Sequence, residues 1–388
     1  MKVKMIALFF ILSIIYLPIS SLALDKKIRL ITNETLIEEI TAQEDNAKDD
    51  NDDTPAILDK EKMSEYEWIM DGTPVFSPDK KRSALVAMQN GKMFAVVDGV
   101  KGKEYYDVGS VPLFSPDSKH IAYVATDGDK WFAIIDGVEN KAYDGIGKTP
   151  VFSPDGERVF YVAKKGNGKS CAVVDGVEGE EYDGVFEPKF SPDSKRLVYT
   201  AWNDGKAFPV LDGIENKGDY SKLYPIAFSA DSRRLACVAD NDGKQFLVVD
   251  DVESKEGYDS IFNITFSPDS KKIAYGTERD KKCFVVLRGP TYRIERGGEM
   301  LAIATDKVLD DNQYDKIFSI AFSPDNEHVI YPIQKDDKCS VIVDGIKGDQ
   351  YDSIAGIIEF DPQQPLKFDF FAYRDKRNYR VDVEIVEE

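Results

Sequence analysis

The segment Phe114–Ala125, FSPDSKHIAYVA, is one copy of a phrase that returns along most of this chain of 388 residues. The opening phenylalanine of the phrase recurs at Phe76, Phe152, Phe190, Phe228, Phe266, Phe322 and Phe360. The first five steps between these positions are 38 residues long, the sixth is 56 and the seventh is 38 again. A fixed period of this size indicates a repeat architecture, and one insertion of 18 residues accounts for the longer step.

Each repeat unit is predicted to contain four short β-strands. The first strand ends in the Phe-Ser of the phrase, a turn with Pro-Asp follows, and the second strand is apolar on both faces. Asn-Gly or Asp-Gly pairs, the strongest short-range hairpin signal, lead into a third strand, and the fourth strand carries a recurrent Tyr-Asp pair. Four antiparallel strands per unit of about 40 residues predict an all-β fold, a β-propeller of four-stranded antiparallel blades.

The eight anchor phenylalanines predict eight blades. The eighth unit stops after its third strand, and Glu65–Val75, EYEWIMDGTPV, matches the fourth-strand sequence KEYYDVGSVPL. We therefore predict that this N-terminal strand completes the last blade and ties the ring shut, which leaves no exposed sheet edge. Seven blades, with one degenerate unit outside the ring, and an open β-solenoid are the alternatives.

On these residues, FSPDSK followed by IAYVA, the chain resembles the WD40-like repeat in the propeller of TolB-type periplasmic proteins. The resemblance covers roughly residues 63–388 and is specific for the fold but weak for function. It implies a secreted or periplasmic propeller that serves as a platform for protein interactions. The chain departs from that family in its larger number of blades and in residues 24–62, which are too few and too acidic for the α/β domain that precedes TolB-type propellers.

Residues 1–23 have the pattern of a cleaved secretory signal: two lysines, an apolar run and the small residues of Ser21-Leu22-Ala23. An uncleaved membrane anchor is the alternative, but the apolar run is short for a bilayer span and contains Pro18. We expect residues 24–62 to form an acidic, disordered linker, in which Leu30–Ile40 could be a short helix or a docking segment. Residues 63–388 are then a single propeller domain.

The formal net charge is −20 at pH 7. Nucleic-acid phosphates and anionic membrane surfaces repel such a chain, so we expect no nucleic-acid partner and no stable membrane insertion after signal cleavage. The charge favours a basic protein or peptide as partner of a monomer, although solubility alone also explains it. The four cysteines occupy repeat slots that are filled by aromatic residues elsewhere, so we expect buried free thiols.

The sequence offers no convincing catalytic or cofactor-binding set. His120 and His328 stand in a slot that arginine or lysine fills in other units, so neither a catalytic triad nor a histidine zinc site is expected. Ala163–Ser170, AKKGNGKS, is close to a phosphate-binding loop but leads into a strand, so we interpret it as a hairpin turn. We predict no cofactor, no metal and no enzyme, with a carboxylate-based hydrolase as the alternative.

Positions where the repeats disagree are the candidates for binding, because loops on a rigid frame carry function. The insertion, about Arg288–Lys307, is rich in cations for so acidic a protein, and its candidate residues are Arg288, Tyr292, Arg293, Arg296 and Met300. A hairpin without a partner is the alternative. Lys189, which replaces an apolar residue, and Trp202, at a hairpin, are two further candidates, although Trp202 could equally be packing.

The Tyr-Asp pairs supply a second set of candidates. Their carboxylates are Asp107, Asp144, Asp183, Asp259, Asp315 and Asp352. Repetition places them in a circle on one face, where they could draw a cation or a basic peptide to the channel mouth. Capping of turns is the alternative.

These observations predict a non-enzymatic, secreted or periplasmic β-propeller that acts as a scaffold for protein or peptide binding. The alternative function is a carbohydrate- or small-ligand-binding propeller, hydrolytic or not, with its site at the channel mouth.

Overall fold

A computed structural model describes residues 28–36 and 64–387, except positions 148, 217, 219, 291, 297–298, 304–305, 310–311 and 362–363. Every regular element in these residues is a β-strand, and none of them forms a helix that could span a membrane. The strands make eight antiparallel sheets with four strand positions each, and one separate hairpin. The predicted all-β propeller architecture with eight blades is therefore confirmed, and the alternative of seven blades is wrong.

The blades are numbered in chain order. The first strands are β2 (Trp68–Ile69) with β3 (Val75–Phe76), β7 (Asp107–Val108) with β8 (Leu113–Phe114), β12 (Gly145–Ile146) with β13 (Val151–Phe152), β17 (Gly184–Phe190), β21 (Lys222–Phe228), β25 (Ser260–Phe266), β31 (Lys316–Ile317) with β32 (Ala321–Phe322), and β36 (Ser353–Asp361). The second strands are β4 (Ser83–Gln89), β9 (Ile121–Thr126), β14 (Val159–Lys164), β18 (Leu197–Asn203), β22 (Leu235–Asn241), β26 (Ile273–Arg279), β33 (Val329–Lys335) and β37 (Gln364–Arg374). The first strand is thus split into two short pieces in blades 1, 2, 3 and 7.

The third and fourth strands of each blade follow here in the same blade order. The third strands are β5 (Lys92–Val97), β10 (Trp131–Ile135), β15 (Ser170–Val174), β19 (Lys206–Leu211), β23 (Lys244–Val249), β27 (Lys282–Arg288), β34 (Lys338–Val343) and β38 (Arg377–Glu387). The fourth strands are β6 (Val100–Lys101), β11 (Val138–Glu139), β16 (Val177–Tyr182), β20 (Ile214–Glu215), β24 (Val252–Glu253), β30 (Asp306–Val308), β35 (Ile346–Lys347) and, in blade 8, β1 (Ile28–Leu36). The remaining hairpin, β28 (Tyr292–Arg296) and β29 (Glu299–Ile303), is inserted in blade 6.

The core lies between successive blades. Val86 and Ala95 of blade 1, for example, pack against Tyr123, Ala125 and Ile134 of blade 2 in one buried cluster. Burial on both faces explains why the second strands are apolar at consecutive positions rather than at alternate ones.

Blade 8 is completed by β1, so the prediction that an N-terminal strand closes the last blade is confirmed. The nine residues of β1 pair antiparallel with β38, from Ile28 opposite Glu387 to Leu36 opposite Tyr379. The assignment of this strand to Glu65–Val75 is wrong, because that segment forms the first strand of blade 1. Residues 28–36 were also expected in a disordered linker; the rest of that linker and the signal segment lie outside the described residues.

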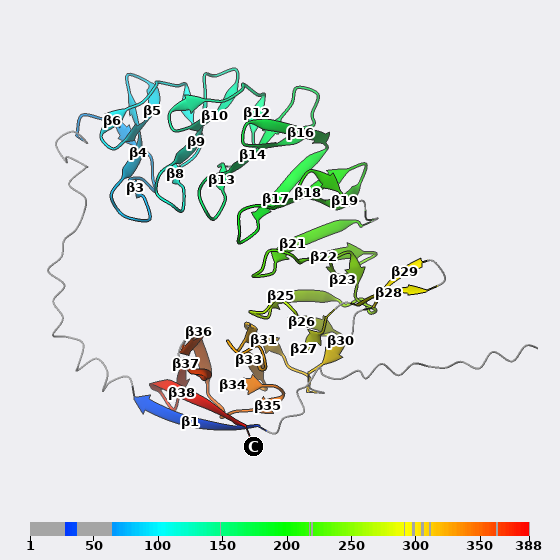
Figure 1. The fold of residues 1–388 in the computed structure, drawn as a ribbon. Helices are drawn as coiled ribbons and strands as arrows, with labels where there is room; N and C mark the ends of the chain where they lie inside the picture. Colours follow the sequence, from blue (N-terminus) through cyan, green and yellow to red (C-terminus); the bar gives the residue numbers. More distant parts are fainter. Residues whose placement is uncertain are drawn as a thin grey trace, which may run out of the picture.

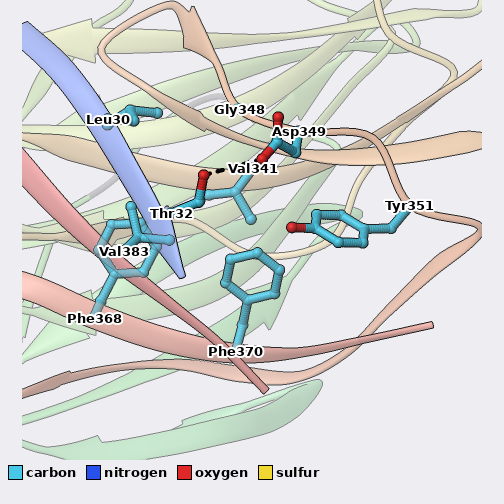
Figure 2. Close-up of a pocket in the computed structure, with 9 residues that line it drawn as sticks. All are labelled: Leu30, Thr32, Val341, Gly348, Asp349, Tyr351, Phe368, Phe370 and Val383. Carbon is cyan, nitrogen blue, oxygen red and sulfur yellow. Dashed lines mark hydrogen bonds between the residues drawn. The ribbon is translucent and has the colours of Figure 1, made fainter. Parts of the chain in front are cut away.

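Side-chain hydrogen bonds hold β1 in place, in addition to its backbone pairing with β38. Thr32 Oγ1 donates to Asp349 Oδ2 at 3.0 Å, and Tyr351 of blade 7 donates its hydroxyl to Glu34 Oε1 at 2.9 Å. Figure 2 shows Leu30, Thr32, Tyr351 and Phe370 among the residues that line a cavity of only about 10 Å³. The strand is therefore closely packed against both blade 7 and blade 8.

The eight blades follow an arc, with their first strands on its inner side (Figure 1). Blades 1 and 8 lie apart in this view, and no described strand pairs across them, so the predicted closure of the ring is not found. Phe76 in blade 1 is 40% exposed, whereas its counterpart Phe114 is 7% exposed beneath Arg82 of the preceding blade. The end of the arc at blade 1 thus lacks the neighbour that covers this position elsewhere.

The face of blade 8 that points away from blade 7 carries charged side chains beside the exposed Phe371 and Tyr373. Arg380 pairs with Asp369 at 3.3 Å and with Asp382 at 3.6 Å. The corresponding positions of blade 1 are alanine or valine and are packed against blade 2. A solvated outer face of this kind is typical of the end unit of a repeat array.

Candidate functional site

The Tyr-Asp pairs mark the step from one blade to the next. Tyr143 forms a bridge with Trp131 in blade 2, and the N–H of Asp144 donates to the carbonyl of Lys164 in blade 3. The same face of the arc carries the hairpins between second and third strands. The aspartates therefore lie where two blades meet, as the repeat predicts.

Five of these aspartates join neighbouring blades through a lysine. The pairs are Lys130–Asp144 at 2.5 Å, Lys169–Asp183 at 2.6 Å, Lys244–Asp259 at 2.5 Å, Lys282–Asp315 at 2.9 Å and Lys338–Asp352 at 2.6 Å. The second carboxylate oxygen of Asp183 accepts the N–H of Asp204, in the hairpin turn of the next blade, at 2.9 Å. Asp259, Asp315 and Asp352 repeat this bond.

These bonds keep the carboxylates ionised. The lysine and then the turn N–H lower the pKa of Asp183, Asp259, Asp315 and Asp352 below its usual value. Since each negative charge has a lysine partner and a turn donor, the contacts agree with the turn-capping alternative.

Asp107 does not belong to this set. Tyr105, which is buried and bridges Met93, fills the tyrosine slot of blade 1. Tyr106 fills the aspartate slot, and its N–H donates to the carbonyl of Thr126. The double tyrosine of KEYYD shifts the apparent pair by one residue, so the placement of Asp107 in the circle is wrong.

The Ser-Pro-Asp phrase connects the blades at the opposite face. The N–H of Asp79 donates to Ser118 Oγ of the next blade at 3.1 Å. Arg82 donates to Asp98 in its own blade at 2.9 Å and to the carbonyl of Lys119 in the next blade at 2.5 Å. Arg158, Arg196 and Arg234 repeat this pattern. The motif is therefore a structural connector.

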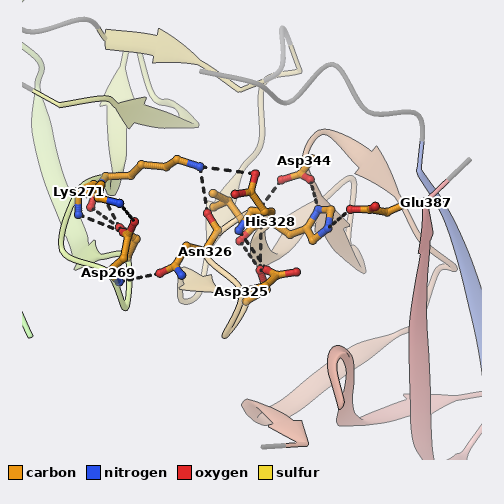
Figure 3. Close-up of polar contacts among 12 residues, drawn as sticks. Asp269, Lys271, Asp325, Asn326, His328, Asp344 and Glu387 are labelled. Atoms are coloured by element: carbon orange, nitrogen blue, oxygen red, sulfur yellow. Dashed lines mark hydrogen bonds and ion pairs between the residues drawn. The ribbon is translucent and has the colours of Figure 1, made fainter. Parts of the chain in front are cut away.

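The two histidines take the place of this arginine. His120 Nδ1 lies 2.7 Å from Asp136, and His328 Nδ1 lies 2.6 Å from Asp344. His328 is 2% exposed, and its Nε2 faces Glu387 of β38 at 3.8 Å (Figure 3). Burial opposes the charged form, but the hydrogen bond to Asp344 and the nearby carboxylates outweigh it and raise the pKa of His328 above its usual value.

The insertion of blade 6 is a hairpin arm, defined as β28, β29 and the turn between them. It projects outward from the arc, between β27 and β30 (Figure 1). Tyr292, Arg293 and Arg296 lie on β28, and Met300 lies on β29. These four candidates are thus brought together on one two-stranded element, away from Lys189 and Trp202 in blade 4.

Arg288 is not part of an exposed binding surface. It is 0% exposed, and it holds both carboxylate oxygens of Asp306, at 2.6 and 2.9 Å. It also donates to the carbonyl of Val252 in blade 5 at 3.2 Å. The prediction of Arg288 as a docking residue is wrong, because the pair with Asp306 locks the base of the arm inside the blade.

Lys189 and Trp202 lie in the same blade, on the neighbouring strands β17 and β18, at different positions along these strands. Lys189 is exposed on β17, opposite Val198, and Trp202 on β18 is 41% exposed, opposite Gly184. Phe186, which sequence analysis missed, is exposed between them on β17. Only its position in a first strand, on the inner side of the arc, could have indicated it.

A further depression of about 400 Å³ lies between blades 2 and 3, a feature that sequence analysis did not single out. It is lined by Gly109, Ser110, Val124, Trp131, Ile146, Gly147 and Thr149. Within the described residues, no three His, Cys, Asp or Glu side chains converge in a way that could hold a metal ion.

Two other sequence interpretations agree with the structure. Ala163–Ser170 spans the β14–β15 hairpin, as interpreted, and does not precede a helix. The four cysteines are free and buried, and burial raises the pKa of Cys237 to about 12.

Comparisons with known proteins find likenesses among solved structures. No protein-family model and no curated protein matches the chain. Among solved structures, the chain is similar to TolB from Acinetobacter baumannii, with 15% identity over 75% of this chain and 59% of that one and a TM-score of 0.24. It is also similar to a eukaryotic initiation factor, with 10% identity over 81% and 87% of the two chains and a TM-score of 0.42.

An oligogalacturonate lyase in complex with manganese is a third similar structure, with 12% identity over 81% and 89% of the two chains and a TM-score of 0.32. The chain is thus similar to β-propeller proteins, TolB-type propellers among them, as the Ser-Pro-Asp phrase predicts.

Proposed function

We propose that the protein is a non-enzymatic scaffold that captures another protein or peptide with the hairpin arm of blade 6. The observation that carries this proposal is the way in which the arm is rooted. The buried Arg288 clamps Asp306 with two bonds and reaches a carbonyl of blade 5, so the base of the arm has a fixed position on the frame. Binding elements are typically loops held by such a rigid frame.

The electrostatics of the repeated aspartates favour a scaffold over a hydrolase. A hydrolase with two carboxylates needs one of them to stay protonated near neutral pH, as the proton donor. The pKa of Asp183, Asp259, Asp315 and Asp352 is instead lowered by lysine and turn contacts. These residues are suited to joining blades and not to proton transfer.

The same proposal places the protein outside the cytoplasm, as a monomer with a protein or peptide partner. The signal-like N-terminal sequence supports the location. The thiols are compatible with an oxidising compartment, because a buried cysteine such as Cys237 with a pKa of about 12 is unreactive.

The experiment replaces the arm by the Asp-Gly-Val turn of blades 1, 2 and 3: Arg288→Asp and Asp306→Val with residues 290–305 removed, so that both members of the buried pair are replaced. Ile214→Lys, an exposed site at the corresponding corner of blade 4, is the matched control. Wild type and both variants are immobilised and incubated with envelope extract and culture fluid, and the affinity of the purified partner is then measured. We expect the control to bind like wild type and the armless variant to lose at least about tenfold in affinity, or ~1.4 kcal/mol.

Thermal unfolding separates binding from folding in this test. The armless variant should melt within a few degrees of wild type, since the turn that replaces the arm is the one the other blades use. If it does not fold, Tyr292→Ser with Arg293→Ser on the intact arm takes its place. Equal affinity with and without the arm would refute the proposal.

A further inference from the structure

The face of blade 1 that points away from blade 2 is apolar. Four residues of β4 and β5 form a buried cluster on it: Leu85, Ala87, Phe94 and Val96. None of the four is more than 4% exposed, although blade 1 lies at the end of the arc (Figure 1). The described apolar residues that pack against the cluster, Tyr66 and Ile69, belong to blade 1 or to the chain that leads into it. The face thus has no described blade in front of it and is shielded from water all the same.

The same positions of blade 2 show what covers them in the interior of the arc. Tyr123, Ala125 and Ile134 correspond to three of the four residues, one repeat of 38 positions later. They pack in one cluster against Val86 and Ala95 of blade 1. Ala95 lies on the third strand β5, so the third strand of one blade forms part of the cover of the next. The outer face of blade 1 is therefore built like an interior interface.

A third-strand sequence stands at the matching distance before blade 1. Residues 55–66, PAILDKEKMSEY, align with residues 94–105, FAVVDGVKGKEY, which run from the third strand of blade 1 to its buried tyrosine. Five of the twelve positions are identical at this spacing of 39 residues: Ala56, Asp59, Lys62, Glu65 and Tyr66. The corresponding stretch of blade 2, residues 132–143, is FAIIDGVENKAY. Residues 55–66 are therefore a further copy of the third strand and of the segment that follows it.

Tyr66, the last residue of this copy, already lies on the outer face of blade 1. Its ring packs edge-on against Phe94 at 5.6 Å. Tyr182 of blade 3 packs in the same way against Phe208 of blade 4, at 5.8 Å. The copy is thus anchored at its end, in the register that an interior blade uses for its neighbour.

The same register accounts for the part of the face that stays exposed. In the interior, Arg82 lies over the ring of Phe114 in the next blade. The counterpart of Arg82 at the spacing of 39 residues is position 43, which is not part of the copy. Phe76, the counterpart of Phe114 in blade 1, is accordingly exposed.

We propose that residues 55–59 of the same chain dock on this face as an additional third strand. They lie outside the described residues. In the repeat register, Ala56 and Leu58 take the places of Ala95 and Val97, which face blade 2. Because Ala56 is only ten positions from Tyr66, its effective concentration at the face exceeds that of a second copy of the chain. The docking involves neither the hairpin arm nor its partner.

Photo-crosslinking identifies the segment that covers the face. The full-length protein carries p-benzoylphenylalanine in place of Leu58 or, as the control, in place of Asn51, which lies outside the copy. On irradiation we expect the probe at position 58 to link within one molecule to the peptide of β4 or β5, as read by mass spectrometry. The probe at position 51 should not reach this face. A link between two molecules, whose yield falls on dilution, would assign the face to a second copy and overturn the proposal, as would links elsewhere or none.

Acidic substitutions test the same contact without a probe. Ala56→Glu with Leu58→Glu should detach the segment, raise the fluorescence of the dye ANS at least about twofold and lower the melting temperature by a few degrees. Asn46→Glu with Asn51→Glu adds the same charge outside the copy and should behave like wild type. Unchanged dye binding and melting in the first variant would refute the docking. If that variant does not fold, the crosslinking experiment decides.

Discussion

The hydroxyl of Tyr351 donates to Glu34 Oε1 at 2.9 Å, although 317 positions of sequence separate the two residues. Tyr143 makes the same bond to Glu178 of the next blade at 2.9 Å, and Tyr220 makes it to Glu253 at 2.6 Å. Burial, and then the glutamate, raise the pKa of all three tyrosines above the usual value, so the phenols remain donors. The β1 strand thus does for blade 8 what a fourth strand does for an interior blade.

Glu34→Ala should lower the free energy of unfolding by about 1–3 kcal/mol, because it leaves the buried Tyr351 hydroxyl without its charged acceptor. Urea denaturation of Glu34→Ala, Tyr351→Phe and the double variant measures the coupling between them. Glu65→Ala, in the segment first assigned to blade 8, is the control and should be near neutral. A loss at Glu65 with none at Glu34 would contradict the assignment of β1.

His328 should make stability depend on pH near neutrality. Its folded pKa lies above the usual value of 6.5, so its stabilising contribution is complete below that value and is lost as the pH rises through the folded pKa. The groups that face it are Asp344 and Asp325 of its own blade and Glu387 of blade 8. Urea denaturation between about pH 6 and about pH 9 should show a fall in wild type that His328→Gln lacks.

His120→Gln is the control for this measurement, since His120 has the same aspartate contact but is not buried. It should keep the wild-type pH dependence. Identical profiles for wild type and His328→Gln would show that the imidazolium does not link blades 7 and 8.

Asp306→Ala should cost about 3–5 kcal/mol, because it leaves the guanidinium of Arg288 buried without its counter-charge. Arg288→Met with Asp306→Leu should recover most of this loss, since an apolar pair of similar volume removes the unpaired charge. Guanidinium chloride denaturation compares the two, with Lys307→Ala as a control at an exposed neighbour. A small effect of Asp306→Ala would mean that the base of the arm is not clamped by this pair.

Asp183→Asn should reduce the pH dependence of the free energy of unfolding in the acid range. The folded pKa of Asp183 lies below the usual value of 3.8, so its contribution is present above that value and is lost as the pH falls through the lower folded pKa. The variant removes this contribution at neutral pH and should therefore flatten the acid limb of the stability profile. Asp129→Asn, an exposed aspartate in a nearby hairpin, should leave the acid limb unchanged.

The sequence predicts the blades well because each of their boundaries carries a local signal. Turns such as Asp136-Gly137, both with positive φ, announce the hairpins, and the repeat period aligns them. The strand that completes blade 8, β1, could not be found in this way. Most fourth strands are only two residues long, as in β6, so the repeat offers almost no sequence pattern by which β1 could be recognised.

The match at Glu65–Val75 nevertheless had a physical basis. Tyr66 packs edge-on against Phe94 at 5.6 Å, just as Tyr182 of blade 3 packs against Phe208 of blade 4 at 5.8 Å. The segment therefore carries the tyrosine of the step between blades, although its strands belong to blade 1.

The candidate site was predictable only in part. The insertion stands out as a break in the period, but the burial of Arg288 depends on Asp306 across the base of the arm. The lysine partners of the aspartates were within reach of sequence analysis, because Lys169 and its counterparts begin third strands at a constant place in the repeat. The depression between blades 2 and 3 was not within reach of sequence analysis, because it depends on how residues of two blades lie together.

The ion pairs of Arg380 with Asp369 and Asp382 bear on how copies of this molecule meet. Repeated sheets with apolar faces can associate head to tail. The first sheet of one copy then packs on the last sheet of another, and a filament results. At this end, such an addition would strip water from charges that are already matched, while Phe371 and Tyr373 are the exposed apolar side chains that it would cover. The ion pairs of the terminal sheet therefore oppose fibre formation.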